Sequence, residues 1–318
     1  MPMNLAELTP IAADEEKAFT LVEGILWPNG PICPHCGATD RVYELKGVKD
    51  KRGRVRPGLK KCGHCRKQFT VRVGTIFEDS HIPLGKWLLA FHAMCSSKKG
   101  ISASQLQRQL GLSYKSAWHM CHRVRVAMTE KSLGPKLGGS GTSGIVEADE
   151  TYIGGKLSNN MHKNKTDAAG KKTIVLTLVE REGRARTFVI PSTGRETLKF
   201  MPIYNVEGTA HIVTDSHASY RGIAKHFASH SAVDHSKEYV RGVVHTNFAE
   251  SYHSLLKRGI VGTFHHISEK HLPRYLREFE FRWNSRKDTD GERTEAAIRG
   301  AEGKRLMYAD PRTRRVAK

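Results

Sequence analysis

The sequence contains no hydrophobic run long enough to cross a membrane. Its most apolar stretch, TIVLTLV at residues 173–179, has the length of a strand and is bounded by charged residues. Residues 1–19 lack the apolar segment of a secretory signal, so we expect a cytoplasmic location. No internal repeat is present, and 318 residues suffice for two or three domains with cores of their own.

Acidic residues are strongly outnumbered by basic ones. Asp and Glu total 32 against 52 Lys and Arg, which gives a formal net charge of +20 and a pI near 9.8. A positive field of this size attracts polyanions and speeds their association. Nucleic acid is therefore the first partner to consider, and a basic but otherwise ordinary enzyme is the alternative.

Cysteines are few, but four of the six form two Cys-x-x-Cys pairs, CPHCG at 33–37 and CGHC at 62–65. In a reducing compartment such pairs are metal ligands rather than disulfides. A tetrahedral zinc ion needs four ligands of this kind, and it stabilises a module too small to build a core. We expect one structural Zn²⁺ on Cys33, Cys36, Cys62 and Cys65, with His35 and His64 as alternative ligands.

A helix-turn-helix pattern lies in residues 102–128, SASQLQRQLGLSYKSAWHMCHRVRVAM. The pattern predicts a first helix that ends at Leu110, a turn GLS, and a second helix that begins near Tyr114. Such a unit places its second helix in the major groove of DNA. The alternative is a plain helical hairpin. The residues expected on the DNA side are Tyr114, Lys115, His122, Arg123 and Arg125.

A Gly/Ser-rich stretch, KLGGSGTSG at 136–144, reads as a flexible linker, and an α/β pattern follows it. We expect strands at GIVEADETYIGG, KTIVLTLVERE, RARTFVIP and AHIVTDS, and helices near 194–205, 217–228, 246–258 and 268–286. On the last helix, Leu276, Phe279 and Trp283 mark the packed face. Arg274, Arg277, Arg282 and Arg286 are candidates for phosphate contacts.

Three acidic residues of this domain come from separate elements. Asp149 lies within the first strand, Asp215 ends the fourth, and Glu250 lies on a helix. Carboxylates so arranged can hold two Mg²⁺ ions for phosphoryl transfer. Taken singly, each also has a structural interpretation as a strand-end cap, a helix cap or half of an i,i+4 ion pair.

Several stretches resemble bacterial insertion-sequence transposases that begin with a zinc ribbon: QFTVRVGTIFEDSHIPLGKWLLA, VEADETYIGGK, IVTDSHASY, HTNFAESYHSLLKRGIVGTFHHIS and KHLPRYLREFEFRWNSR. Thirty-four residues separate Asp215 from Glu250, and Lys257 follows seven positions later. This spacing is similar to the D,D(34 or 35)E signature of the integrase-like DDE superfamily. The resemblance extends from Trp27 to Arg286.

The resemblance implies an α/β catalytic domain of RNase H-like (integrase-type) fold. Asp149, Asp215 and Glu250 would form the catalytic triad and hold two Mg²⁺ or Mn²⁺ ions. Lys257 and Arg258 would contact DNA.

Three further residues compete for roles at this site. Some relatives use Asn as the third ligand, so Asn247 is an alternative to Glu250 and otherwise a DNA contact. Glu147 shares the strand face of Asp149, whereas Glu150 is expected on the opposite face.

Histidines are frequent around Glu250 and in the residues that follow it, at positions 245, 253, 265, 266 and 271. We expect polar groups near DNA or on helix flanks, and a second zinc site or a general base is the alternative.

The implied function is that of a DNA transposase. Water would hydrolyse a phosphodiester at the element end, and the freed 3'-hydroxyl would attack target DNA. Two ends and one double-stranded target imply at least a homodimer on DNA, associated with the nucleoid. The alternatives are a non-catalytic DNA-binding regulator and an RNase H-like nuclease without joining activity.

The expected segments follow in order. They are an N-terminal helical segment at 1–28, a zinc ribbon at 29–78, a helix-turn-helix at 79–132, a linker at 133–144, the RNase H-like domain at 145–290, and a basic, mobile tail at 291–318.

Overall fold

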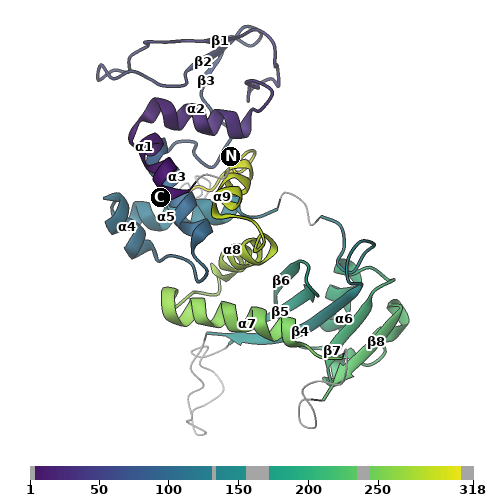
Figure 1. Ribbon diagram of the computed structural model, residues 1–318. Helices are drawn as coiled ribbons and strands as arrows, with labels where there is room; N and C mark the ends of the chain where they lie inside the picture. The colour runs from purple at the N-terminus through teal and green to yellow at the C-terminus, as the bar shows by residue number, and fades with distance from the viewer. Residues whose placement is uncertain (1–3, 131–133, 155–171, 235–243, 309–318) are drawn as a thin grey trace, which may run out of the picture. The chain divides into compact units, whose positions relative to one another are not determined.

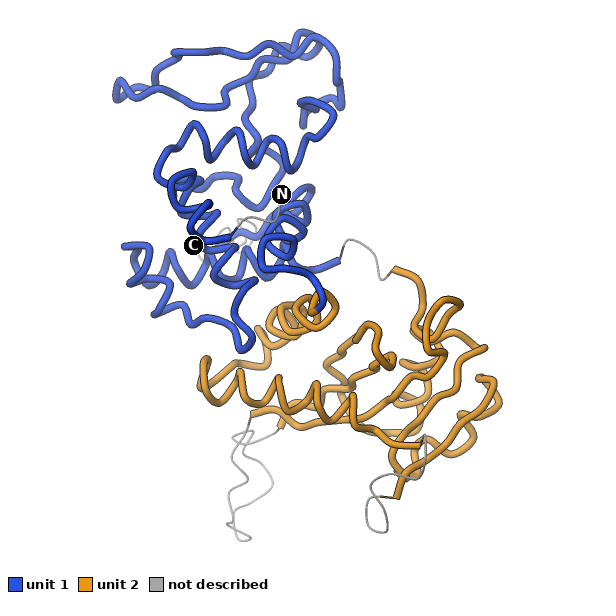
Figure 2. The backbone as a smooth tube through the Cα atoms, in the orientation of Figure 1, with its two compact units in different colours: residues 1–130, 287–318 blue, residues 131–286 orange. Residues whose placement is uncertain are grey.

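The computed structural model describes residues 4–130, 134–154, 172–234 and 244–308 (Figure 1). The chain divides into two compact units (Figure 2). Unit 1 comprises residues 1–130 together with 287–318, and unit 2 comprises residues 131–286. No helix among the described residues is both long and apolar enough to cross a membrane.

Unit 1 begins with two helices, α1 (Leu5–Ala13) and α2 (Glu15–Leu26), where the sequence analysis expected one. Asn4 and Glu7 form a capping box at the start of α1. Asp14 ends α1 and caps α2, because its carboxylate accepts the backbone N–H groups of Glu16 and Lys17. The sequence NLAE carried the signal of the missed helix.

A small antiparallel sheet follows, in the order β1 (Val42–Glu44), β2 (Lys60–Cys62), β3 (Gln68–Phe69). The alternating stretch QFTVRVGTIF at residues 68–77 predicts a strand, but the strand ends at Phe69 and the chain then enters consecutive turns. The Thr75 hydroxyl donates to the Arg72 carbonyl at 2.7 Å, and the Gly74 N–H donates to Glu78. Such local bonds favour turns over a strand ladder.

The two helices and the turn expected at residues 102–128 are present. After α3 (Leu84–Ser96), α4 (Ala103–Leu110) and α5 (Tyr114–Ala127) pack together across the expected turn. Gly111 adopts the left-handed conformation that ends α4, with φ of 58°. Ser113 then caps α5 by accepting the Ser116 N–H at 3.2 Å.

The mobile tail expected after residue 290 is wrong for residues 290–299, which form α9 (Asp290–Arg299). Thr289 and Glu292 make a capping box at its start. Ala297 and Ile298 are fully buried, and α9 packs against α2, α3 and α5 of unit 1. Residues 309–318 of the expected tail lie outside the described part of the chain.

Unit 2 is built on a five-stranded sheet. Its order is β6 (Ala185–Ile190), β5 (Thr173–Glu180), β4 (Ile145–Ile153), β7 (His211–Asp215), β8 (Ser229–Val233). β5 runs antiparallel to both of its neighbours, β6 and β4, whereas β7 runs parallel to both β4 and β8. This order and these directions are those of the expected RNase H-like fold.

Each face of this sheet has its own apolar core. On one face Val146, Ala148 and Leu178 pack with α6 (Arg195–Asn205) and the 3₁₀ segments η1 (Ala218–Tyr220) and η2 (Ile223–His226). On the other face Val175 and Val179 pack with α7 (Asn247–Gly259), the π-helical η3 (Ile260–Phe264) and α8 (Leu272–Asn284). Alternate residues of β4 therefore enter opposite cores.

Two expectations for unit 2 differ from the structure. The helix expected near 217–228 forms only η1 and η2, and β8 was not predicted. The flexible linker is wrong around Leu137, which is fully buried and exchanges backbone hydrogen bonds with Asn205 and Glu207. The Gly138 N–H donates to Glu180 at 2.7 Å. This part of the Gly/Ser-rich stretch belongs to the unit 2 core.

Candidate active site and zinc centre

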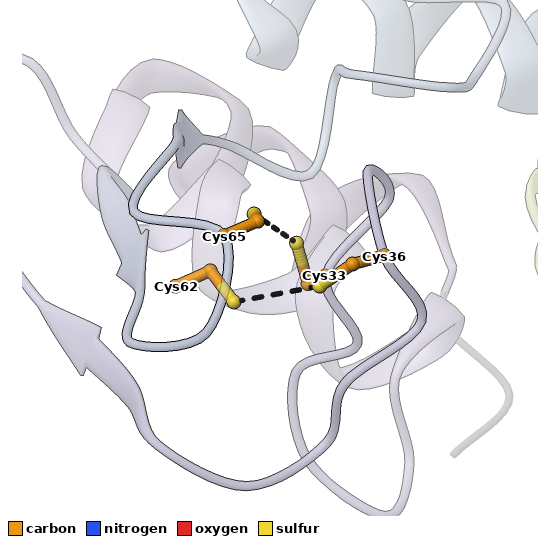
Figure 3. A group of neighbouring side chains, drawn as sticks. All are labelled: Cys33, Cys36, Cys62 and Cys65. Carbon is orange, nitrogen blue, oxygen red and sulfur yellow. Dashed lines mark hydrogen bonds between the residues drawn. The ribbon is translucent and has the colours of Figure 1, made fainter.

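The four knuckle cysteines converge at one point of the small sheet (Figure 3). The Sγ atoms of Cys33 and Cys65 are 3.7 Å apart, and those of Cys36 and Cys62 are 3.6 Å apart. The two histidines considered as alternatives are outside this group: His35 is exposed, and His64 Nε2 lies 3.0 Å from Asp40.

The chemistry of these thiols fits a zinc ion. The backbone N–H of Cys65 hydrogen-bonds the Cys62 sulfur, and such bonds lower the pKa of Cys62 to about 6, whereas desolvation and the three neighbouring sulfurs raise the pKa of Cys36. A thiolate is the form that binds metal. Trp27 and Phe69 pack beside the cluster with ring centroids 6.0 Å apart. Few other apolar side chains surround the cysteines, so the hydrophobic core of this module is small. A module this small needs the ion for stability.

In unit 2, three carboxylates meet where β7 ends beside the middle of β4. Asp149, Glu150 and Asp215 each offer one oxygen within 4.8 Å of the others. The parallel register pairs Ala148 with Thr214, which places Asp149 beside Asp215. Strand pairing thus brings together two residues that are far apart in sequence.

Glu150 joins this group although it was expected to face away from Asp149. Pairing of β4 with β7 stops at Ala148 and Thr214, so the Asp215 carboxylate at the end of β7 lies within reach of acids on both faces of β4. The Tyr220 hydroxyl donates to its carboxylate. Burial, together with Asp215 and Asp149, raises the pKa of Glu150 to about 7. Glu150 thus faces the Tyr220 side of β4 and Asp149 the α7 side, as expected, yet their oxygens still come within 4.8 Å of each other and of Asp215.

Helix α7 contacts the acidic group through His253. Nδ1 of His253 lies 3.3 Å from Asp149 Oδ2, and Nε2 lies 2.9 Å from the Thr177 hydroxyl. The side chain is buried. His253 therefore does not lie on an exposed helix flank, and its expected place near DNA stays a prediction. Its position three residues after Glu250 was the available signal.

Glu147, the other acid near Asp149, uses both carboxylate oxygens in hydrogen bonds within the protein. One of its oxygens accepts the backbone N–H groups of Phe248 and Ala249, at 2.8 and 3.0 Å. The other accepts Arg181 Nε at 2.8 Å. This fully buried carboxylate therefore caps the N-terminus of α7 and fixes that helix against β4.

The remaining residues expected at the site lie along α7. Glu250 occupies the first turn, 3.4 Å from the Thr246 hydroxyl, and is not within the 4.8 Å group. Asn247, Lys257 and Arg258 are exposed, the last two at the C-terminal end of the helix.

The DNA-facing residues expected on α5 divide into two groups. Tyr114 and Lys115 are exposed at its N-terminus. His122, Arg123 and Arg125 are buried, so their expected place on an exposed face is wrong. Arg123 Nε donates to the Leu306 carbonyl at 3.0 Å, because the segment after α9 covers this part of α5.

One arginine of α8 is also buried where an exposed position was expected. Arg282, a candidate phosphate contact, is buried and paired with Glu278.

The comparisons agree with this architecture. Residues 13–68 match the transposase zinc-ribbon domain, and residues 141–284 match the ISXO2-like transposase domain. The chain therefore carries the two domains of an insertion-sequence transposase. This transposase is thus a DDE-type enzyme of insertion sequences with an N-terminal zinc ribbon. The ribbon match begins well before the expected residue 29 and includes α2, which the Lys60–Glu23 ion pair joins to the sheet at 2.8 Å.

The transposase is also similar to individual proteins. It is 27% identical over 290 residues to an uncharacterised protein in transposable element ISH50 of Halobacterium salinarum, which covers 84% of this chain and 90% of the relative. Among solved structures, a pre-cleavage Mos1 transpososome matches with 15% identity and a TM-score of 0.26, over 69% of this chain and 80% of that chain. A Mos1 mariner paired end complex with Mn matches with 14% identity and a TM-score of 0.29, over 66% and 73%.

Proposed function

We propose that this transposase binds the ends of its insertion sequence and catalyses divalent-metal-dependent strand cleavage and strand transfer. The observation that carries the proposal is the convergence of Asp149, Glu150 and Asp215 beside an α7 helix that a buried carboxylate holds in place. Carboxylate oxygens are the ligands that Mg²⁺ and Mn²⁺ prefer. A bound cation would offset the mutual repulsion of these three carboxylates.

Asp149 and Asp215 would hold two Mg²⁺ or Mn²⁺ ions, with Glu250 as the third ligand. Glu250 is the sole acidic residue in the sequence of α7, and it lies on the same helix face as His253, which contacts Asp149. Glu150 and Asn247 are the competing third ligands. Bound divalent ions stabilise the charge that develops on the attacking and leaving oxygens of a phosphodiester.

The protein's own groups would orient this chemistry. His253 holds the Asp149 carboxylate between β4 and α7, and Tyr220 holds that of Glu150. Lys257 and Arg258, exposed at the end of α7, are the cations proposed to contact the DNA backbone near the site.

In unit 1, Tyr114 and Lys115 at the N-terminus of α5 would approach base edges of the element end, and the four-cysteine zinc ribbon would add affinity. Two ends joined to one target would require at least a homodimer on double-stranded DNA. The proposal places the enzyme at the cytoplasmic nucleoid because its substrate lies there.

The proposal is tested with duplexes that carry the terminal sequence of the element and a labelled 3' strand. Parent protein with Mg²⁺ or Mn²⁺ should nick the element end and join it to target DNA. Asp149→Asn and Asp215→Asn should bind the same duplex while cleavage falls by at least about 10³-fold, as for loss of an essential catalytic group. Binding without nicking by the parent would support a regulator, and nicking without joining would support a nuclease.

The third ligand is identified by comparing Glu250→Gln, Glu150→Gln and Asn247→Ala in the same assay. Loss of a metal ligand should raise the metal concentration needed for half-maximal cleavage as well as lower the rate. Glu250→Gln should show both effects. If only Glu150→Gln shows them, the assignment moves to Glu150.

A further inference from the structure

Residues 45–59, which connect β1 and β2 of the zinc ribbon, form a hydrogen-bonded β-hairpin, here called the basic hairpin. It extends the β1–β2 ladder, because Leu45 N–H donates to the Leu59 carbonyl at 2.8 Å and Arg56 N–H donates to the Val48 carbonyl at 2.8 Å. Lys49 and Val55 pair across the two arms. The segment is therefore a two-stranded antiparallel ribbon.

Asp50, the single acid of the basic hairpin, organises its tip. One carboxylate oxygen accepts the backbone N–H groups of Arg52 and Arg54, at 2.8 and 3.0 Å. The other accepts both Nε and an Nη of the Arg54 guanidinium, at 3.0 and 2.8 Å. Gly53 supplies the left-handed conformation that the turn needs, with φ of 77°. These bonds fix the tip before any partner binds.

The other cations of the basic hairpin face water. Its sequence holds six Lys and Arg residues, of which Arg54 pairs with Asp50 and Lys46 lies 3.5 Å from Glu44. Among the described residues, no carboxylate lies within ion-pair distance of the four others. These are Lys49, Lys51, Arg52 and Arg56, all exposed.

We propose that the basic hairpin binds duplex DNA as a preformed unit, with Lys51 and Arg52 at its tip on the phosphate backbone. The major groove admits a two-stranded β-ribbon, and unpaired cations on such a ribbon meet phosphates along both groove edges. Sequence-independent phosphate contacts of this kind supply affinity and fix register. This inference rests on the proposed function, because it takes DNA as the substrate.

Asp50 allows charge and shape to be separated. Removing its carboxylate makes the hairpin more positive, so charge alone would tighten DNA binding. If the ordered tip is what fits the duplex, the same change weakens binding, since ordering must then occur at the moment of association. The two accounts therefore predict opposite signs.

The experiment measures binding of the full chain to an element-end duplex by fluorescence anisotropy between about 50 and 200 mM salt. The double variant Lys51→Ala/Arg52→Ala should bind at least about 10-fold more weakly, and its slope of log K against log salt should be shallower by about 1 to 2. The matched control is Lys98→Ala/Lys99→Ala, two exposed lysines elsewhere in unit 1. Asp50→Ala should also weaken binding, and zinc content should stay unchanged in every variant.

Three outcomes would overturn the inference: hairpin variants that match the control pair, tighter binding by Asp50→Ala, or an equal loss of binding to polyglutamate, which would indicate a general acidic partner. Cleavage by the parent keeps the result separate from the proposed function. An active parent whose hairpin variants bind normally refutes the hairpin alone. An inactive parent whose hairpin variants lose DNA affinity refutes the transposition chemistry alone.

Discussion

Nδ1 of His253 lies 3.3 Å from Oδ2 of Asp149, and Nε2 of the same ring lies 2.9 Å from the Thr177 hydroxyl. A neutral imidazole satisfies both contacts when Nδ1–H donates to the carboxylate and Nε2 accepts from Thr177. The ring joins α7 to β4 and β5 through Asp149 and Thr177. Partners of this kind orient metal ligands.

His253→Leu should therefore weaken metal-dependent cleavage by about 10- to 100-fold, because Asp149 loses its orienting donor. His253→Asn should recover part of the loss, since its amide N–H group can replace Nδ1–H. The measurement is the metal concentration for half-maximal cleavage. His266→Leu, at an exposed histidine, is the control. An unchanged metal requirement in His253→Leu would contradict the positioning role.

Glu147→Ala should destabilise unit 2 by about 3–5 kcal/mol, because it leaves Arg181 as a buried charge without its partner and removes the cap of α7. Glu147→Gln should cost less, since its amide oxygen still accepts the backbone N–H groups. Chemical denaturation monitored by circular dichroism gives the free energies of unfolding. Glu269→Ala, at an exposed site, should change them by less than about 0.5 kcal/mol.

The raised pKa of Glu150 predicts a pH effect on stability. Between its ordinary value of 4.5 and about 7, the folded carboxyl holds a proton that the unfolded chain has lost. Its contribution to stability is thus fully present below pH 4.5 and is lost as the pH rises through about 7. With a chelator present to remove divalent ions, the melting temperature of the parent should fall more steeply between pH 5 and 8 than that of Glu150→Gln.

Added Mg²⁺ should reverse this trend in the parent, because a cation held by Asp149 and Asp215 favours the charged form of the adjacent Glu150 carboxyl. Stabilisation by Mg²⁺ should therefore be larger at pH 8 than at pH 6. Parallel pH profiles for the two proteins would count against a shared proton site at Glu150.

Zinc removal should unfold the ribbon and leave the RNase H-like core folded. Trp27 packs on Phe69 beside the thiol cluster, so its fluorescence should shift to longer wavelength when a chelator strips the ion. Trp27→Phe identifies the signal against the three other tryptophans. Cys62→Ser should bind no zinc and show the shifted spectrum without chelator. A full equivalent of zinc in that variant would exclude Cys62 as a ligand.

The sequence allowed much of the architecture to be predicted, because local patterns encode it. Local signals predict several elements: the alternation of β4, the apolar runs of the other strands, the GLS turn, and the Cys-x-x-Cys pairs of the zinc ribbon. The place of Glu150 depends on where β7 stops pairing with β4, which no local pattern specifies. Arg123 was misplaced for a similar reason, since a segment from about 180 residues later covers it.

The catalytic unit is an insertion. The chain leaves unit 1 at residue 130, builds unit 2, and returns at residue 287 to supply α9. Truncation at residue 286 would therefore strip a packed helix from unit 1 and expose the apolar surface that Ala297 and Ile298 cover on α9. Unit 1 in isolation should fold only if residues 4–130 are spliced to 287–308 through a designed loop.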